Sequence, residues 1–302
     1  MKAVQQYFSL IKFSHTVFAL PFALIGFFLA LRETASKADT EFSSLSITSK
    51  GFWQTNGSIF LLVLLCMVFA RSAAMAFNRY LDRHIDARNP RTAIREIPAG
   101  IIKADHALLF TVFMSLLFII CCWFINFLCF CLSFVALFVI LFYSYTKRFT
   151  ALCHLVLGVG LSLAPIGAYI AVTGAFATLP LLFSVVVLCW VSGFDIIYAL
   201  QDEEFDKANQ LNSIPAALGK AKALKVSEGL HLLAAVAVIA AGWLGGFSWW
   251  YWIGTAFFTG MLVYQHAIVK PNDLHRVNIA FMTANGIAAV VFAVFVITDI
   301  IR

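Results

Sequence analysis

The stretch FNRYLDRHIDARNPRTAIREIPAG, residues 77–100, follows one of the most apolar runs in the chain, SIFLLVLLCMVFA at residues 58–70. It places Asn78, Asp82 and Asp86 at even four-residue steps and sets five arginines among and beyond them. On a helix, residues four positions apart lie about 40° apart around the axis, so these three side chains form one stripe. The stretch therefore predicts a polar helix end that emerges from an apolar segment.

The composition of the chain indicates that this helix end belongs to a polytopic membrane protein. Of the 302 residues, 62% are apolar and 12% are charged, whereas a soluble domain carries about 25% charged residues. The net charge of +6 does not indicate nucleic-acid binding, because the charges lie in short connections between apolar runs. All seven cysteines lie within apolar runs without a C-x-x-C motif, so neither a disulfide framework nor a zinc site is predicted.

Nine apolar runs are long enough to cross a bilayer, which requires about 17–25 residues. The third and fourth runs are separated by Asn126 alone, so a tight hairpin is predicted there. The first run could belong to a signal peptide, but it is long for one and no A-x-A site follows it, so we interpret it as a retained span. The predicted spans are residues 13–31, 56–77, 106–124, 127–145, 152–172, 179–200, 229–246, 248–268 and 277–299.

The distribution of lysines and arginines predicts which ends of the spans face the cytoplasm. The N-terminal segment and the loops expected on the same side hold 16 of the 21 lysines and arginines. The loops and the C-terminus on the opposite side hold four. Only Arg71 falls within a span. The positive-inside rule then predicts a multi-pass protein of the inner (cytoplasmic) membrane, with a cytoplasmic N-terminus and an external C-terminus.

A pattern of two aspartates and an asparagine occurs twice. Asp-x-x-x-Asp-x-x-Asn occupies residues 82–89 and 202–209, an offset of 120 residues, and each copy is followed by Ile-Pro-Ala. Internal repeats are common in membrane proteins and place functional sites at the repeat interface. Coincidence is the alternative, because few positions match. We expect one membrane domain, residues 1–302, with an internal repeat of about 1–125 and 126–245.

The second copy predicts a second row of oxygen ligands. Asp195 and Asp202 lie nearly two helical turns apart, with Tyr198 on the same stripe and Asp206 four residues further on. The simpler interpretation is a solvated helix end. Against it, Asp195 lies in an apolar run, where an ionisable residue costs on the order of 2.5–3.5 kcal/mol and indicates a functional site. Clustered carboxylates favour a hard cation such as Mg²⁺.

Basic residues near these rows indicate a phosphate ligand. Lys103 and the five arginines could fix membrane topology alone, but their number and position favour contacts with a diphosphate. No GxxxxGK[ST] motif occurs, so a nucleotide is not indicated. Two carboxylate rows at the end of an apolar bundle suit a diphosphate with an apolar tail, such as a prenyl diphosphate. A dry cavity and aromatic faces would then protect and stabilise an allylic cation.

A third motif, YSYTKRFT at residues 143–150, places Tyr143 and Lys147 on one helical face. Alone, it could equally be an interfacial anchor. Together, the three stretches resemble the UbiA-type intramembrane prenyltransferase superfamily. Its N-D-x-x-D-x-x-x-D motif matches except that Arg79 replaces the first Asp; its D-x-x-x-D motif matches the second copy, and its Y-x-x-x-K element matches here.

This resemblance implies nine helices around a central cavity with cytoplasmic capping loops, two Mg²⁺ ions, and attack on the cation by an electron-rich aromatic ring. The sequence looks similar to 4-hydroxybenzoate polyprenyltransferase-like proteins, and most similar to the futalosine-route menaquinone branch, whose acceptor is a dihydroxynaphthoate. The expected partners are a polyprenyl diphosphate, an aromatic quinone precursor and the lipid bilayer, with no nucleic acid and no obligate protein partner.

From the motifs and the resemblance we expect four groups of site residues. These are catalytic Asp82, Asp202, Asp195, Tyr143 and Lys147; metal-binding Asn78, Asp82, Asp86, Asp202 and Asp206; diphosphate-binding Arg79, Arg83, Arg91, Arg95, Lys147 and Tyr198; and acceptor-binding Arg148 and Lys12.

Two other classes of membrane protein use similar residues. A divalent-cation- or proton-coupled transporter would carry intramembrane carboxylates near a repeat, but nearer the middle of the membrane than these rows. A CDP-alcohol phosphotransferase requires a D-G-x-x-A-R opening, and no Asp-Gly pair occurs in the chain.

Overall fold

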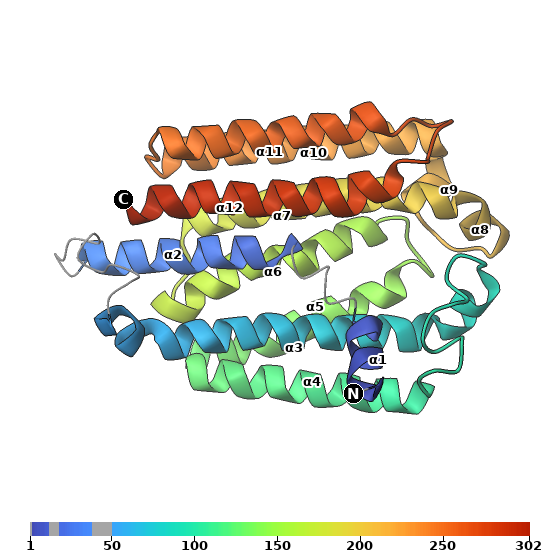
Figure 1. Ribbon diagram of the computed structural model, residues 1–302, viewed down its shortest axis with the longest axis horizontal. Coiled ribbons are helices and arrows are strands. Elements are labelled where there is room, and N and C mark those ends of the chain that lie inside the picture. The colour runs from blue at the N-terminus through green and yellow to red at the C-terminus, as the bar shows by residue number, and fades with distance from the viewer. Residues whose placement is uncertain (1, 12–17, 38–49) are drawn as a thin grey trace.

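The computed structural model describes residues 2–11, 18–37 and 50–302 (Figure 1). Within these ranges the fold is helical throughout, and β pairing is limited to one isolated bridge. The elements are α1 (Lys2–Leu10), α2 (Leu20–Lys37), α3 (Lys50–Arg88), α4 (Ala104–Ile125), α5 (Phe127–Thr146), α6 (Cys153–Thr173), α7 (Thr178–Ala199), η3 (Leu200–Asp202), α8 (Glu203–Ala208), α9 (Ile214–Leu218), α10 (Lys220–Leu244), α11 (Trp249–Ile268), η4 (Ile279–Ala284) and α12 (Asn285–Ile301).

The predicted apolar runs coincide with the long helices, as far as the structure describes them. Seven helices in the described residues are long and apolar enough to cross a membrane. The helices α2 and α11 fall below that standard: α2 carries Arg32, Glu33 and Lys37, and α11 begins with the run WWYW, whose polar ring atoms lower its hydropathy. The all-helical membrane fold is therefore confirmed, and the predicted span at 13–31 lies partly outside the described residues.

The predicted hairpin at Asn126 is present. This residue separates α4 from α5 in an extended conformation, and its side-chain oxygen accepts a hydrogen bond from the Cys129 backbone N–H at 2.8 Å. Its amide group donates to the Ile170 carbonyl at 3.0 Å, which ties the turn to α6. One asparagine thus caps a helix and fixes the hairpin against its neighbour.

The bundle is held together by aromatic packing and by one very close helix crossing. Trp190 of α7 is fully buried, with Phe22 of α2 and Phe258 of α11 at ring-centroid distances of 5.4 and 5.7 Å. A Cβ added to Gly26 would lie 2.0 Å from the Pro165 carbonyl oxygen, so only glycine lets α2 approach α6 this closely.

The elements that matter for function meet at one end of the bundle, on the right in Figure 1, where α3 ends and where α8 and α9 lie. The 39-residue helix α3 continues past the predicted span 56–77 as far as Arg88. The polar stripe of the first motif is therefore the last part of this helix, as the spacing predicts. In α7 the α-helix ends at Ala199, one turn before Asp202.

Candidate active site

A polar cavity of about 180 Å³ lies at this end of the bundle, between the ends of α3, α5 and α7, the start of α6, and the segment that contains α8 and α9. Five carboxylates of the described residues line it: Asp82, Asp86, Asp195, Asp202 and Asp206. Asn78, Asn89, Arg91, Arg95, Tyr143, Lys147, His154 and Tyr198 also line it. The structure thus brings together side chains that the three separate motifs supply.

The first wall of the polar cavity is the stripe on α3. Asn78 donates a hydrogen bond to Asp82 at 3.2 Å. The two carboxylate oxygens of Asp82 lie 2.7 Å from Lys147 Nζ and 3.0 Å from Arg148 Nη2. Asp82 is only 1% exposed, so this charge is tolerated because two cations from the end of α5 compensate it.

The loop after α3 folds back over the cavity. Arg95 donates through Nη1 to both carboxylate oxygens of Asp86, at 2.8 and 2.9 Å. Thr92 donates to the Asp86 carbonyl at 3.1 Å, which holds this loop against the helix that precedes it. These contacts fix the loop over the cavity that Asp86 and Arg95 line.

The same loop bridges to the second wall, which α7 and η3 provide. Asn89 donates to Asp202 at 3.2 Å, and Arg91 donates to Asp202 through both Nε, at 3.0 Å, and Nη2. Arg91 also donates to the Tyr198 hydroxyl at 2.8 Å. Burial lowers the pKa of Arg91, but the hydrogen bond and the charge of Asp202 outweigh it and raise the pKa above its usual value, so this guanidinium stays charged.

Asp206 and Asp195 complete the second wall with different partners. The Ser213 hydroxyl donates to Asp206 at 2.8 Å, and Ser213 also caps the short helix α9. Asp195 lies 2.7 Å from Nδ1 of His154 at the start of α6. The backbone N–H of Asn212 donates to the Lys147 carbonyl at 2.7 Å, which closes this side of the cavity against α5.

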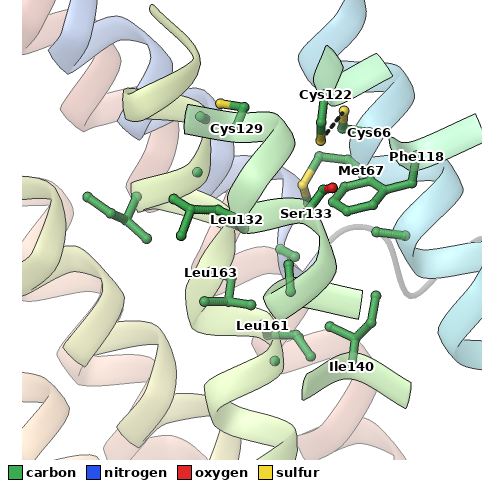
Figure 2. Close-up of a pocket in the computed structure, with 18 of the residues that line it drawn as sticks. Cys66, Met67, Phe118, Cys122, Cys129, Leu132, Ser133, Ile140, Leu161 and Leu163 are labelled. Carbon is green, nitrogen blue, oxygen red and sulfur yellow. Dashed lines mark hydrogen bonds between the residues drawn. The ribbon is translucent and has the colours of Figure 1, made fainter. Parts of the chain in front are cut away.

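A second cavity, apolar and about 300 Å³ in volume, lies within the bundle between α3, α4, α5 and α6. Figure 2 shows this apolar cavity with side chains from all four helices around it, and the thiols of Cys66 and Cys122, 3.8 Å apart, in its wall. Tyr143 lines both cavities. One aromatic side chain is therefore shared by the lining of a charged cavity and of an apolar one.

Three expected site residues lie elsewhere, and a fourth is not among the described residues. Arg79 is buried but does not line the polar cavity, and Arg83 donates to the Tyr80 carbonyl and stacks on its ring. Arg148 is occupied by Asp82 and by the Leu81 and Ser144 carbonyls, rather than facing the cavity. Lys12 lies outside the described residues.

Sequence reasoning missed three side chains that belong to this region. His154 and Ser213 line the polar cavity, and Arg71 lines the apolar cavity without a hydrogen-bond or ion-pair partner among the described residues. Arg71 did carry a signal, because it is an arginine within a predicted span. His154 carried a weaker one, as a histidine near the start of a predicted span, and nothing in the sequence singled out Ser213.

The oxygens of the polar cavity fit a hard divalent cation that a substrate phosphate helps to hold. Among the described residues, no group of three His, Cys, Asp or Glu side chains could hold a metal ion by itself. Mg²⁺ is typically bound by one or two carboxylates together with phosphate oxygens and water. Asn78 with Asp82 on one wall, and Asp202 with Asp206 on the other, offer that kind of incomplete oxygen set.

Comparison with known proteins gives a family match over most of the chain. Residues 19–287 match the model of the UbiA prenyltransferase family. The chain is 30% identical to a 4-hydroxybenzoate octaprenyltransferase of Nitrosospira multiformis over 244 residues, which are 81% of this chain and 84% of that protein. It is 31% identical to the enzyme of the same name from Tolumonas auensis, over 77% of this chain and 82% of that one.

Solved structures have the same fold. A UbiA homolog from Aeropyrum pernix K1 superimposes with a TM-score of 0.75 at 28% identity, covering 95% of this chain and 97% of that chain. A UbiA homolog from Archaeoglobus fulgidus bound to GPP and Mg²⁺ superimposes with a TM-score of 0.68, covering 98% and 99% of the two chains. At 18% identity, the similarity to the Archaeoglobus fulgidus protein shows a shared fold alone.

Proposed function

The chain belongs to the UbiA prenyltransferase family, and we propose that it uses Mg²⁺ to transfer a polyprenyl group from a prenyl diphosphate to an aromatic quinone precursor. It is a prenyltransferase and a multi-pass membrane protein. The proposed reaction is ionisation of the allylic diphosphate, followed by electrophilic substitution on the aromatic ring.

The observation that carries this proposal is the pair of cavities, one polar and one apolar, that share Tyr143 in their lining. A prenyl diphosphate has a charged head and an apolar tail, and the two compartments offer one environment for each. The head would lie among Arg91, Arg95 and Lys147, which would exchange their ion pairs with Asp202, Asp86 and Asp82 for pairs with phosphate oxygens. The tail would lie along the apolar cavity, toward Cys66 and Phe118.

The proposed roles of the chain's own residues follow from where they lie. Asn78, Asp82 and Asp86 on the first wall, with Asp202 and Asp206 on the second, would hold Mg²⁺, which when bound would neutralise charge on the leaving diphosphate. Tyr143 would present its aromatic side chain to the developing allylic cation, an interaction worth about 2 kcal/mol or more when desolvated. The apolar cavity would exclude water, which otherwise captures the cation.

The acceptor is an aromatic acid in this proposal. Arg148, expected to bind its carboxylate, is held by Asp82, whereas Arg71 faces the apolar cavity beside its boundary with the polar one. A charged side chain in such surroundings indicates a functional site, so we assign the acceptor carboxylate to Arg71. The relatives described above are named 4-hydroxybenzoate octaprenyltransferases. A dihydroxynaphthoate for menaquinone is our preferred acceptor, from the resemblance of residues 78–100 to the menaquinone branch.

The proposed arrangement in the membrane is nine crossings, with the polar cavity and the N-terminus on the cytoplasmic side of the inner membrane. The distribution of Lys and Arg supports this orientation. An internal repeat of about 1–125 and 126–245 is also proposed, supported by the facing positions of the two aspartate rows across the polar cavity.

The test is an assay of the purified full-length chain with Mg²⁺, geranylgeranyl or longer prenyl diphosphates, and either 4-hydroxybenzoate or dihydroxynaphthoates. We expect prenylated aromatic product, and release of diphosphate in equal amount. Absence of product from every donor and acceptor pair would reject the proposed function. Turnover of the benzoate alone would replace our preferred acceptor.

A further inference from the structure

The loop between α3 and α4, residues 89–103, carries two of the basic residues that we assign to the diphosphate. Arg91 and Arg95 each pair with an aspartate of the polar cavity. The next residue, Glu96, is 7% exposed and does not line that cavity. A buried carboxylate is costly unless other groups compensate it. The groups around Glu96 therefore show how the side of the loop away from the cavity is held.

Glu96 joins this loop to α1. Its Oε1 atom accepts a hydrogen bond from the Ser9 hydroxyl, and Oε2 has no hydrogen-bond partner among the described residues. Its backbone carbonyl accepts from the N–H groups of Ile101 and Ile102, at 2.9 and 3.0 Å, so the loop turns tightly around this residue. The charge of Glu96 also acts on the buried guanidinium of Arg79, so two buried groups of opposite sign compensate each other.

Apolar contacts join the same two segments. Leu10 of α1 is fully buried, in a cluster that includes Ile97 and Ile102 of the loop. The rings of Tyr7 and Phe110 lie 4.8 Å apart between their centroids, which fixes α1 against α4. Helix α1 lies across α3 and α4 rather than along them (Figure 1), and none of its described residues lines the polar cavity. It therefore contacts the loop from outside the site.

We propose that α1 is a clamp for residues 89–103, and that Ser9 and Glu96 are positioning residues for the arginines of this loop. The role of Arg91 and Arg95 toward the diphosphate rests on the proposed function. In that function both arginines exchange their aspartate partners for phosphate oxygens, so the ion pairs that hold the loop change when substrate binds. The contacts with α1 do not involve these arginines. They can therefore keep the loop in place while the ion pairs exchange.

Matched variants separate this clamp from general stability. Ser9→Ala removes the hydroxyl that Glu96 accepts from, and Ser9→Thr retains it. Ser115→Ala is the control, because it removes a 2.8 Å hydrogen bond within α4 that does not reach the loop. Leu10→Ala removes the apolar anchor, and Leu262→Ala removes the same side-chain volume from a buried position of α11.

The first measurement is the rate at which trypsin cleaves after Arg91 in the purified full-length protein without ligand. Cleavage of a transiently opened segment reports how often it is open. Ser9→Ala should accelerate cleavage about tenfold, because a hydrogen bond to a charged group contributes about that factor. Leu10→Ala should accelerate it on the order of 100-fold, as loss of a buried leucine predicts. Ser9→Thr and both control variants should stay within about twofold of the parent protein.

The second measurement connects the clamp to catalysis. Ser9→Ala should raise the KM for geranylgeranyl diphosphate about threefold or more, because fewer molecules present the closed loop to the donor. Its kcat should stay within about twofold of the parent value, because α1 contacts no reacting group. In a Glu96→Ala background, Ser9→Ala should change neither the cleavage rate nor KM by more than about twofold, since the two side chains act through one contact.

Three results would overturn the proposal. One is equal cleavage rates in Ser9→Ala and Ser115→Ala, or in Leu10→Ala and Leu262→Ala, which would leave α1 no specific hold on the loop. Another is a full effect of Ser9→Ala in the Glu96→Ala background. The third is an unchanged KM in Ser9→Ala. The proposed function has its own test: Mg²⁺ with inorganic diphosphate should slow cleavage of the parent protein. If it does not, the diphosphate site fails, while the cleavage rates without ligand still decide whether α1 holds the loop.

Discussion

The two walls of the polar cavity have the same aspartate spacing but are built differently. On α3, Asp82 and Asp86 lie on one uninterrupted helix, and cations from other segments compensate both. On the second wall the α-helix ends at Ala199, a 3₁₀ turn carries Asp202, and the short helix α8 carries Asp206. The first wall is therefore determined by helix periodicity, whereas the second depends on hydrogen bonds from the loop after α3 and from Ser213.

The largest expected effect tests whether both walls are needed. Asp82→Asn and Asp202→Asn should each lower prenylation on the order of 100- to 1000-fold, because each removes charge that stabilises the leaving diphosphate through the metal. Product formation in purified protein measures this. Arg88→Gln, at an exposed position at the end of α3, is the control. Full activity in either aspartate variant would show that one wall suffices.

The Mg²⁺ dependence of activity shows how much each wall contributes to metal binding. EDTA should abolish prenylation, and Mg²⁺ should restore it. In Asp86→Asn and Asp206→Asn, the Mg²⁺ concentration for half-maximal activity should rise about 10- to 100-fold, the usual effect of disturbing groups around a metal. A Mg²⁺ titration of each variant measures this shift. A shift in only one variant would assign the metal to that wall alone.

Each wall also has one ionisable residue deeper in the bundle: Arg71 on α3 and Asp195 on α7. Arg71→Met should lower the preference for a carboxylated acceptor over the same phenol without its carboxylate by about tenfold or more, because a charged hydrogen bond contributes about 1.5–3 kcal/mol. The ratio of kcat/KM for the two acceptors measures this preference. An unchanged ratio would separate Arg71 from the acceptor.

The smallest expected effect concerns the support of the second wall. Ser213→Ala should lower the free energy of unfolding by about 1 kcal/mol, because Ser213 caps α9. Asp206 also loses its 2.8 Å hydrogen bond, so activity should fall by only about two- to fivefold. Thermal unfolding in detergent and the prenylation rate measure the two effects. A loss as large as that of Asp202→Asn would mean that Ser213 contacts the substrate.

Much of the first wall could be predicted from the sequence, because a four-residue spacing has one consequence on a helix. Asn78, Asp82 and Asp86 line up as expected, and Asn126 forms the predicted hairpin. Two expected diphosphate ligands, Arg79 and Arg83, lie outside the cavity lining, because each follows a residue of the stripe by one position and so points about 100° away from it around the helix. The number of arginines and their positive charge do not predict which arginine side chain faces the polar cavity.

The second wall was less predictable, for a physical reason. Where a helix gives way to short turns, side-chain direction depends on tertiary contacts. The pairing of Asp195 with His154 joins residues 41 positions apart, and that of Arg91 with Asp202 joins residues 111 apart. No local pattern encodes these contacts. The motifs therefore identified the carboxylates but not the groups that hold them.

The length of α3 has a consequence for how a product would leave. Its 39 residues extend about 58 Å, nearly twice the hydrocarbon thickness of about 30 Å. Its polar stripe can thus reach the aqueous boundary while the apolar middle of the helix lies among lipid tails. A prenyl diphosphate bound as proposed would be held at both ends, by its head and by its chain. Once the diphosphate is lost, the lipid-soluble product no longer has a group that the basic residues attract, and it can partition sideways into the bilayer. Cleavage of the diphosphate would then itself allow the product to leave the site.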